Sequence, residues 1–486
     1  MHASGLGQLA ILPLDVLGII LLKAGAKQIR ILNRTLNRLF DEVNTSLNIT
    51  FPSYRYEDVK TLHDVGLLIG NVIRSSKALV SVNLDVRRLL NGLPIYETSE
   101  EMLDVFFTSL AALKGLQKLI LPRSYIGPAG SASLASSLVT LTGLHALDLS
   151  HNGIHPAGAT SLAPSLMALT GLHVLLLHRN DIGPAGAASL APSLMALTGL
   201  YKLNLGGNAI GPAGAALLAP SLTTLTGLYE LCLDDNNLGS AGAASLAPSL
   251  IMLTGLQDLN LSDNNIAPAG AASLAPSLMA LTGLCKLYLG GNHINPAGAA
   301  SLAPSLMALT GLQELYFSWN LIDSAGAASL APSLTALTGL HTLFLRGNYI
   351  NPAGASSLAP SLTALTGLQE LDLSDNNIGP AGATSLAPSL MAMTGLHYLD
   401  LARNHIGPAG AASLSPSLMA MTGLHYLDLG GNGIGQAGIA SLAPSFKKLT
   451  GIQNLFVGGN DYEVFDDESD DESDEESDEE SDDDEI

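Results

Sequence analysis

The chain has 486 residues, a formal net charge of −22 and only 2 cysteines. Much of the charge belongs to one short segment, because residues 466–485 contain 16 acidic residues and no Lys or Arg. The remaining residues lack the dense Lys and Arg that binding to a phosphate backbone requires, so the composition argues against a nucleic-acid partner.

The sequence also bears on the compartment of the protein. No uninterrupted apolar run is long enough to span a membrane, and residues 10–22, which are apolar, are interrupted by Pro13 and Asp15. We therefore expect neither a membrane partner nor a targeting segment there. Cys232 and Cys285 fall on strands separated by an intervening strand, which is beyond the usual span of a disulfide. Free thiols predict a reducing, cytoplasmic setting.

Residues 1–50 predict a helical cap outside the repeats. Pro13 suits the first turn of a helix over residues 12–23, where its missing N–H group costs nothing. After a break at Gly25, apolar residues at helical spacing predict a second helix over residues 27–43.

The sequence of this predicted hairpin resembles the F-box family. The similar features are Leu12-Pro-Leu-Asp-Val-Leu, an apolar run, and then Leu32-Asn-Arg-Thr-Leu-Asn-Arg-Leu. The resemblance implies that the hairpin docks a Skp-type adaptor of a ubiquitin ligase. The same hairpin equally suits a hydrophobic cap that covers the first repeat, because solenoids need terminal caps for solubility.

Residues 51–115 predict degenerate first repeats. Apolar residues at helical spacing predict a helix over residues 58–76. Leu79, Val82 and Leu84 then reproduce the strand of a repeat, and residues 87–98 form an insertion.

From residue 116 to residue 462 the chain repeats with a period of 28 residues. One unit contains Leu144, Leu147, Leu149, Asn152 and Ile154, followed by a Pro-Ala-Gly turn and further leucines. Twelve full units begin at Leu116, Leu144, Leu172, Leu200, Leu228, Leu256, Leu284, Leu312, Leu340, Leu368, Leu396 and Leu424, and an incomplete one begins at Ile452.

These units resemble the ribonuclease-inhibitor class of leucine-rich repeats. The resemblance implies an α/β solenoid, a right-handed horseshoe with a parallel sheet on the concave face and helices on the convex face. The residues agree, because the leucines of a short strand can turn inward and an Asn at the following turn can bond backbone groups that would otherwise be unsatisfied. We expect a ladder of asparagines.

Nearly every unit places a proline about eight residues into its expected helix, as at Pro164 and Pro192. A proline there removes a hydrogen bond and clashes with the preceding turn, at a cost of about 3 kcal/mol. We therefore predict two short helical pieces per unit, with the break on the convex side.

Residues 463–486 predict a disordered acidic tail, because they contain too little apolar surface to form a core. Ser469, Ser473, Ser477 and Ser481 are each followed by acidic residues, a context that resembles acidophilic casein-kinase sites. Repeats joined to an acidic tail also resemble the Ran GTPase-activating proteins, which implies binding to a small GTPase and ordering of its own catalytic residue.

Function is expected at the strand positions that the leucines leave free. Large aromatic residues in three successive units predict an anchor patch for a partner, since aromatics dominate binding energy at interfaces. The residues of this patch are Tyr288, Tyr316, Trp319 and Phe344.

A second candidate surface combines carboxylates with histidine, tyrosine and arginine. Like charges on adjacent strands repel, which indicates recognition of a basic surface. The residues are Asp372, Asp400 and Asp428, with His397, Tyr398, Arg403, His425 and Tyr426 beside them.

No nucleophile motif, phosphate-binding loop or metal signature accompanies these residues, so we predict no catalytic residues, no cofactor and no metal. Seven histidines, His145, His151, His173, His178, His341, His397 and His425, occupy variable positions typical of a polar binding face. The sequence thus predicts a non-enzymatic scaffold that recognises a protein partner on the concave face. The F-box-like resemblance implies a client-selecting adaptor of a ubiquitin ligase or a bacterial effector of that kind, and the alternative resemblance implies a GTPase-activating protein of the Ran type.

Overall fold

A computed structural model describes residues 46–50, 81–85 and 99–460 of the chain. The helices predicted at residues 12–23, 27–43 and 58–76 and the acidic tail lie outside the described residues. Within them, no helix is long and apolar enough to cross a membrane.

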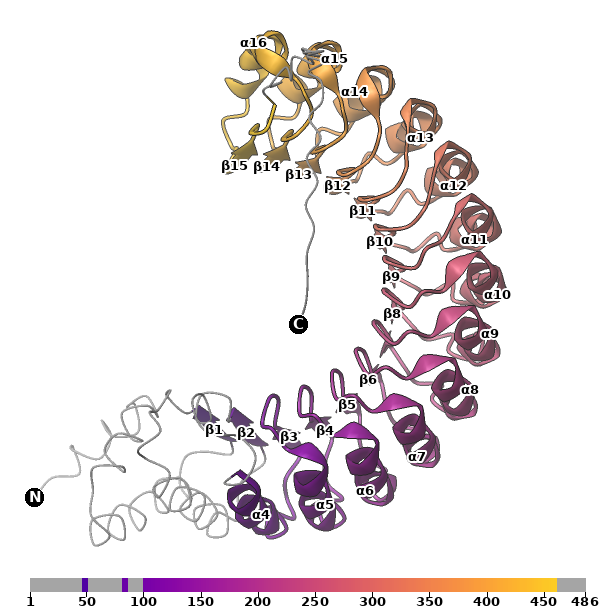
Figure 1. Cartoon of the computed structure of the whole chain (residues 1–486), viewed down its shortest axis with the longest axis vertical. Coiled ribbons are helices and arrows are strands. Elements are labelled where there is room, and N and C mark those ends of the chain that lie inside the picture. Colours follow the sequence, from indigo (N-terminus) through magenta and orange to yellow (C-terminus); the bar gives the residue numbers. More distant parts are fainter. Residues whose placement is uncertain (1–45, 51–80, 86–98, 461–486) are drawn as a thin grey trace, which may run out of the picture.

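The described residues form one parallel sheet of 15 strands, each paired with the next strand in the sequence. Figure 1 shows the strands on the inner side of a horseshoe and the helices on its outer side. The strands are β1 (Ser46–Thr50), β2 (Ser81–Asp85), β3 (Lys118–Ile120), β4 (Ala146–Asp148), β5 (Val174–Leu176), β6 (Lys202–Asn204), β7 (Glu230–Cys232), β8 (Asp258–Asn260), β9 (Lys286–Tyr288), β10 (Glu314–Tyr316), β11 (Thr342–Phe344), β12 (Glu370–Asp372), β13 (Tyr398–Asp400), β14 (Tyr426–Asp428) and β15 (Asn454–Phe456).

A helix follows each strand from β3 to β14 and packs against the helix of the next unit. The helices are α4 (Ser99–Leu110), α5 (Gly127–Leu138), α6 (His155–Met167), α7 (Gly183–Ala196), α8 (Gly211–Leu222), α9 (Gly239–Leu250), α10 (Ala267–Ala280), α11 (Pro296–Ala308), α12 (Ser324–Ala336), α13 (Pro352–Ala364), α14 (Gly379–Ala392), α15 (Gly407–Ala420) and α16 (Gly435–Phe446). The predicted fold class, an α/β solenoid with the sheet on the concave face, is confirmed.

The repeated leucines form one continuous core between the sheet and the helices. The middle residue of β8 is Leu259, and the strand is flanked by Leu256 and Leu261. Behind them pack Leu274 and Leu278 of α10, and all five leucines are at most 1% exposed. Because successive side chains of a strand point to opposite faces, the residues between these leucines face the concave side.

The asparagine ladder runs without interruption from Asn152 to Asn460. Asn264 is typical: its Oδ1 accepts the backbone N–H of Asn236, and its Nδ2 donates to the carbonyls of Leu233 and Leu261. Each amide therefore joins its own turn to the turn of the preceding unit, as the sequence predicts. The first full unit has Ser124 in place of the asparagine.

The prediction of a split helix is wrong, because each of these prolines lies inside one continuous helix. Pro164 of α6 is exposed on the convex surface, and so is Thr160, whose carbonyl would normally receive the missing N–H bond. Water can reach that carbonyl, so the proline leaves no buried acceptor unsatisfied.

A second ladder, made of serines, binds the helices where the prolines occur. The serine after each proline is buried, and in most units its Oγ donates to the carbonyl that precedes the proline of the previous helix. Ser277, for example, donates to Ala247 at 2.7 Å, and Ser193 donates to Ala163 at 2.6 Å. These bonds join neighbouring helices at the end where a proline interrupts the regular pattern.

At the N-terminal end, residues 46–50 form strand β1 and not the end of a helical cap. β1 pairs in parallel with β2, with Leu47 opposite Val82 and Ile49 opposite Leu84. The strand predicted around Val82 and Leu84 is confirmed, and the sheet begins before the boundary predicted at residue 50. Phe107 of α4 is fully buried and contributes to the first part of the core.

Candidate functional site

Six aromatic side chains form an aromatic ladder along the C-terminal half of the concave face. Adjacent rings lie 4.3 to 6.0 Å apart between their centroids. The ladder consists of Tyr288, Tyr316, Phe344, Tyr398, Tyr426 and Phe456.

The ladder joins two clusters that the sequence places apart. The rings of Tyr288 and Tyr316 are stacked, with an interplanar angle of 6°, and Phe344 meets Tyr316 edge to face. The next contact, between Phe344 and Tyr398, passes over β12, which has no aromatic residue. Phe344 directly follows the middle leucine of its unit, whereas Tyr398 directly precedes the middle leucine of its own unit. The two side chains meet because they lean towards each other across β12. Sequence reasoning missed both this contact and Phe456.

Trp319 lies outside the ladder, in the loop after β10. It has a positive φ of 55°, is 55% exposed, and lies against Gly347 of the next unit. The guanidinium carbon of Arg346 lies 5.2 Å from the centroid of the Trp319 ring, a cation–π arrangement. The structure thus places Trp319 beside the ladder formed by the other three residues of the predicted patch, and Arg346 is a residue that sequence reasoning missed.

The three carboxylates of the predicted acidic column are aligned in the sheet, with Asp372 opposite Asp400 and Asp400 opposite Asp428. Asp372 and Asp400 are both only 5% exposed. Each uses one oxygen locally, because Oδ1 of Asp372 accepts the N–H and hydroxyl of Ser374 and Oδ1 of Asp400 accepts the N–H of Ala402. The column therefore holds the strand ends in place as well as contributing negative charge.

Burial alters the acidity of this column. It raises the pKa of Asp400 to about 6, and the neighbouring Asp372 and Asp428 act in the same direction. The pKa of Asp372 is also raised, mainly by burial, although its hydrogen bonds from Ser374 oppose the change. The hydroxyl of Tyr398 lies 3.4 Å from Oδ2 of Asp400, and burial raises the pKa of that tyrosine.

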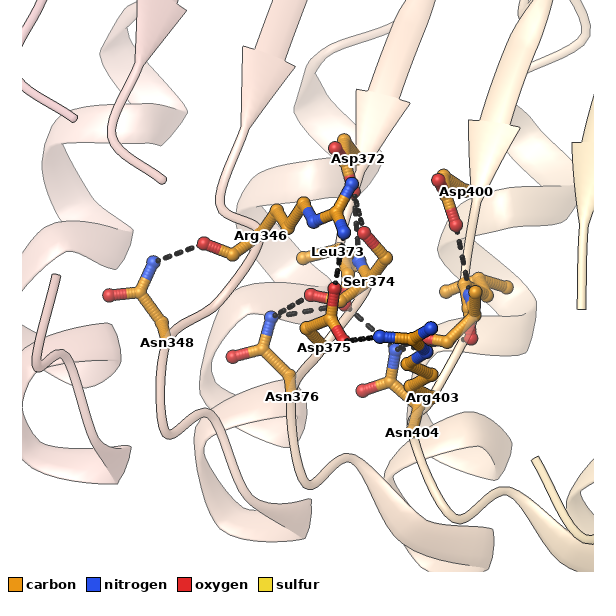
Figure 2. Close-up of polar contacts among 12 residues, drawn as sticks. Arg346, Asn348, Asp372, Leu373, Ser374, Asp375, Asn376, Asp400, Arg403 and Asn404 are labelled. Atoms are coloured by element: carbon orange, nitrogen blue, oxygen red, sulfur yellow. Dashed lines mark hydrogen bonds and ion pairs between the residues drawn. The ribbon is translucent and has the colours of Figure 1, made fainter. Parts of the chain in front are cut away.

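Beside the column, two arginines share one carboxylate, as Figure 2 shows. Arg346 lies 2.8 Å from Oδ2 of Asp375, and Arg403 lies 3.5 Å from Oδ1. The side chain of Asp375 is 17% exposed and that of Arg403 is 73% exposed. Both arginines are thus paired with Asp375 and not with a carboxylate of the acidic column.

At the other end of the ladder, Glu314 binds both stacked tyrosines. Its Oε2 accepts hydrogen bonds from Tyr316 at 3.1 Å and from Tyr288 at 3.4 Å, and its Oε1 lies 2.6 Å from Nζ of Lys286. Burial and the adjacent carboxylates raise the pKa of both tyrosines, so the phenols stay neutral donors. The face therefore presents flat rings whose edges are held by carboxylates.

The predicted histidines lie at the edge of this face. His397 and His425 are exposed and stacked, with centroids 5.2 Å apart and an interplanar angle of 11°. Among the residues whose placement the structure describes, no three His, Cys, Asp or Glu side chains are grouped to hold a metal ion. Cys232 and Cys285 are both free thiols.

The parallel sheet, the buried leucines and the amide ladder define a solenoid protein whose concave face is a curved sheet. Six segments of the chain match the leucine rich repeat family model, and the chain is accordingly a leucine-rich repeat protein. The matched residues are 141–163, 200–219, 254–275, 365–387, 393–415 and 421–443.

Three solved structures of leucine-rich repeat and related proteins resemble this chain in the path of the backbone. A leucine-rich repeat protein of Leptospira interrogans is 17% identical, with a TM-score of 0.47 over 84% of this chain and 95% of that one. An internalin of Listeria monocytogenes is 20% identical, with a TM-score of 0.43 over 71% and 82%. TLR13, solved as a complex with ssRNA13, is 18% identical, with a TM-score of 0.45 over 80% and 55%. No curated protein matches the sequence.

Proposed function

We propose that this leucine-rich repeat protein is a recognition scaffold whose concave face binds a basic segment of a partner protein. The observation that supports the proposal most directly is the aromatic ladder, which runs beside buried carboxylates across β9 to β15. The residues involved are Tyr288, Tyr316, Phe344, Tyr398, Tyr426 and Phe456, with Glu314, Asp372, Asp400 and Asp428.

The chemistry of this face suits a cationic chain. The stacked rings give the face an apolar surface along which the stems of Lys and Arg side chains can pack, and carboxylates at the ring edges add charge complementarity. Burial of Asp400 leaves part of its charge without compensation, since its Oδ1 accepts one backbone N–H and its Oδ2 meets only the hydroxyl of Tyr398 at 3.4 Å. A partner cation beside Tyr398 and Asp400 would supply that compensation, so the same groups favour binding and select its charge.

The test uses affinity capture from a lysate with the full-length chain. Replacing Tyr316, Phe344 and Tyr398 by Ala removes the centre of the ladder and should release the captured protein, with a loss of at least tenfold in affinity. Tyr349, which is 58% exposed but has no place in the ladder, provides the control as Tyr349→Ala. Capture of the same proteins by the triple variant would sink the proposal.

Trp319 gives a separate test of the predicted anchor. Trp319→Ala combined with Tyr316→Ala should weaken the partner by about 2 kcal/mol or more, because it removes both the exposed ring beside Arg346 and one step of the ladder. Isothermal titration with the captured partner measures this change. An affinity equal to that of the unchanged chain would exclude Trp319 from the contact.

A narrower proposal is that the scaffold selects clients for a ubiquitin ligase. It is supported by the F-box-like sequence of residues 12–39, which lies outside the described residues. A purified Skp-type adaptor should then bind the full chain, and Leu12→Asp with Leu17→Asp should abolish this binding. An adaptor that binds neither chain excludes the role.

The alternative proposal is a GTPase-activating role of the Ran type, supported only by the combination of repeats with an acidic tail. Stopped-flow measurement of GTP hydrolysis by Ran tests it. Addition of the chain should accelerate hydrolysis if the role is correct, and an unchanged rate excludes it.

A further inference from the structure

Charge is divided unequally along the solenoid. Residues 116–228 contain four Lys and Arg against two Asp and Glu, whereas residues 229–460 contain five against twelve. The aromatic ladder and its carboxylates lie in the second part. The first part therefore offers a different kind of surface, and five histidines add to it.

The basic side chains of the first part converge in the loops after β3, β4 and β5. Arg123, His151 and Arg179 occupy equivalent positions 28 residues apart, with φ values of 52°, 56° and 55°. Backbone bonds fix the loops side by side, since the N–H of Arg123 donates to Ser150 and that of His151 donates to His178. We call Arg123, His151, His178 and Arg179 the basic ridge.

The ridge is limited to these units. In the next unit the position of Arg179 is taken by Gly207, and then by Asp235 and Asp263. The ring of His178 lies 5.2 Å from that of His151, edge to face, and its buried Nδ1 has no hydrogen-bond partner.

Both arginines of the ridge are exposed, and none of the ion pairs among the described residues includes Arg123 or Arg179. Arg346 and Arg403, in contrast, both pair with Asp375. The ridge therefore keeps a positive charge that its own surroundings do not neutralise.

The electrostatic balance at the histidines agrees with this description. Burial and then Arg123 lower the pKa of His151. Burial also lowers the pKa of His178, although Asp148 and Asp234 act in the opposite direction there. The ridge thus resists further positive charge and suits an anion.

We propose that the acidic segment of residues 466–485 folds back across the horseshoe and occupies the basic ridge of Arg123, His151, His178 and Arg179. Sixteen carboxylates in twenty residues match the unpaired arginines, and the same segment is repelled by the acidic second part of the solenoid. The described residues of the same chain thus offer the segment the basic ridge, and the exposed Lys447 and Lys448 after α16 add two cations near the start of the segment.

The chain is long enough for this contact. β4 and β15 are eleven strand steps apart, or about 53 Å along the sheet at roughly 4.8 Å per step. An extended chain spans up to about 3.4 Å per residue, so roughly sixteen residues beyond Asn460 cover that distance. Figure 1 shows the two arms curving so that β15 faces β4 across the open interior, which shortens the path.

Each ion pair of this contact contributes little free energy, and the covalent attachment of the segment to the solenoid maintains the contact. Exposed ion pairs contribute about 0.2–1 kcal/mol each, but attachment to the same chain gives an effective concentration in the range of mM. Salt screens such pairs, so the contact is reversible. Phosphorylation of Ser477 or Ser481 adds roughly −1.5 to −2 charges each and strengthens it. An acidic ligand must displace the segment to reach the ridge.

A fluorescent peptide with the sequence of residues 466–485 tests the proposal by anisotropy at low salt. The protein is the full chain, either unchanged or with the sixteen carboxylates of the segment replaced by their amides. The amide chain should bind the peptide at least tenfold more tightly, because its ridge is free. Adding Arg123→Gln and Arg179→Gln to the amide chain should reduce this binding at least tenfold.

Arg403→Gln in the amide chain is the matched control, because Arg403 is exposed at the same position of a later unit, and it should leave the affinity unchanged. Equal binding by the unchanged and amide chains overturns the proposal, and so does an equal loss with Arg403→Gln. An oligonucleotide that binds through the arginines equally well in both chains also overturns it, since the ridge then serves another polyanion.

Discussion

At the scale of single residues, three large side chains in the loops after the strands pack against the next unit. The large side chains of Arg179, Trp319 and Arg403 are each followed, one unit later, by a glycine. A Cβ added at Gly347 would lie 2.3 Å from the Trp319 ring. The large side chain therefore lies across the backbone of the next unit, in space that only glycine leaves free.

Gly347→Ala should destabilise the chain and displace Trp319. The substitution strains a φ of 63° and also forces the ring to move, so we expect a loss of about 2–4 kcal/mol in the free energy of unfolding. The control is Gly435→Ala, where φ is 62° but no atom lies within 4 Å of the added Cβ. That variant should lose only about 1 kcal/mol.

Denaturant titration followed by tryptophan fluorescence measures both variants, because Trp319 is the one tryptophan of the sequence. A shifted emission spectrum is expected for Gly347→Ala alone. Equal losses of stability in the two variants would show that the ring makes no close contact with Gly347.

The raised pKa of Asp400 makes stability depend on pH. The folded pKa of about 6 exceeds the unfolded value of about 3.9, so the folded state binds the proton more tightly. The free energy of unfolding therefore falls as the pH rises from about 4 to 6, and the loss persists above pH 6. Asp400→Asn should remove this loss and stabilise the chain by about 2 kcal/mol at pH 7.5.

The substitution should preserve the local geometry, because Asn204 and Asn260 already accept the equivalent backbone N–H at the same position. Urea titrations at pH 4.5 and 7.5 measure the effect. Asp428→Asn serves as the control and should change stability less, since Asp428 is more exposed. A stability gain at pH 4.5 as large as at pH 7.5 would contradict the mechanism.

The residue types of the candidate site could be predicted from sequence, but their contacts could not. Tyr288, Tyr316 and Phe344 share one strand position, so their stacking follows from the period. The contact between Phe344 and Tyr398 depends on how far two side chains lean across β12, which strand spacing does not determine. Arg346 has no sequence signature either, because its role arises from Trp319 and Asp375 in two other units.

At the scale of elements, each asparagine of the ladder satisfies the turns of two units. Asn264 is fully buried, and its amide also donates to Ser262 and accepts from the N–H of Leu238. Asn264→Ala leaves several buried backbone groups without partners, so we expect a loss of about 3 kcal/mol or more.

Asn454→Ala provides the control, because Asn454 is exposed in β15 and should change stability by less than about 0.5 kcal/mol. Thermal unfolding followed by circular dichroism measures both variants. A small effect at Asn264 would show that water replaces the missing amide.

The helices show where element-level prediction from sequence fails. The cost of a proline in a helix is an average for sites whose i−4 carbonyl needs that N–H. Here Thr160 lies on the exposed side of the helix, and the buried serines bind carbonyls of neighbouring helices instead. The sequence shows the proline but not which side of the helix faces water. The expected free-energy cost of the proline, and with it the expected break in the helix, therefore does not apply here.

At the scale of the whole molecule, each unit shares its backbone hydrogen bonds and helix packing with its neighbours, so protection depends on having a neighbour on both sides. Leu287 in β9 is fully buried, whereas Leu455 and Phe456 in β15 are 37% and 48% exposed. Amide hydrogen exchange should therefore be slowest in the central strands and faster in β15.

Exchange followed by mass spectrometry measures this gradient. Protection in β15 equal to that in β9 would contradict it, and would indicate that β15 is covered by a further part of the chain. The pairing of β15 with β14 is the internal reference, since β14 has neighbours on both sides.

The repeated bonds of the asparagine ladder also give the solenoid a fixed spacing between units. Because each asparagine joins the backbone one period away, removal of one complete 28-residue unit leaves the new neighbours with the same bonds. The gain or loss of a whole unit between β5 and β9 changes the distance between the basic ridge and the aromatic ladder by one strand spacing, about 4.8 Å. The distance between the two proposed binding surfaces can thus change in fixed steps without a new fold.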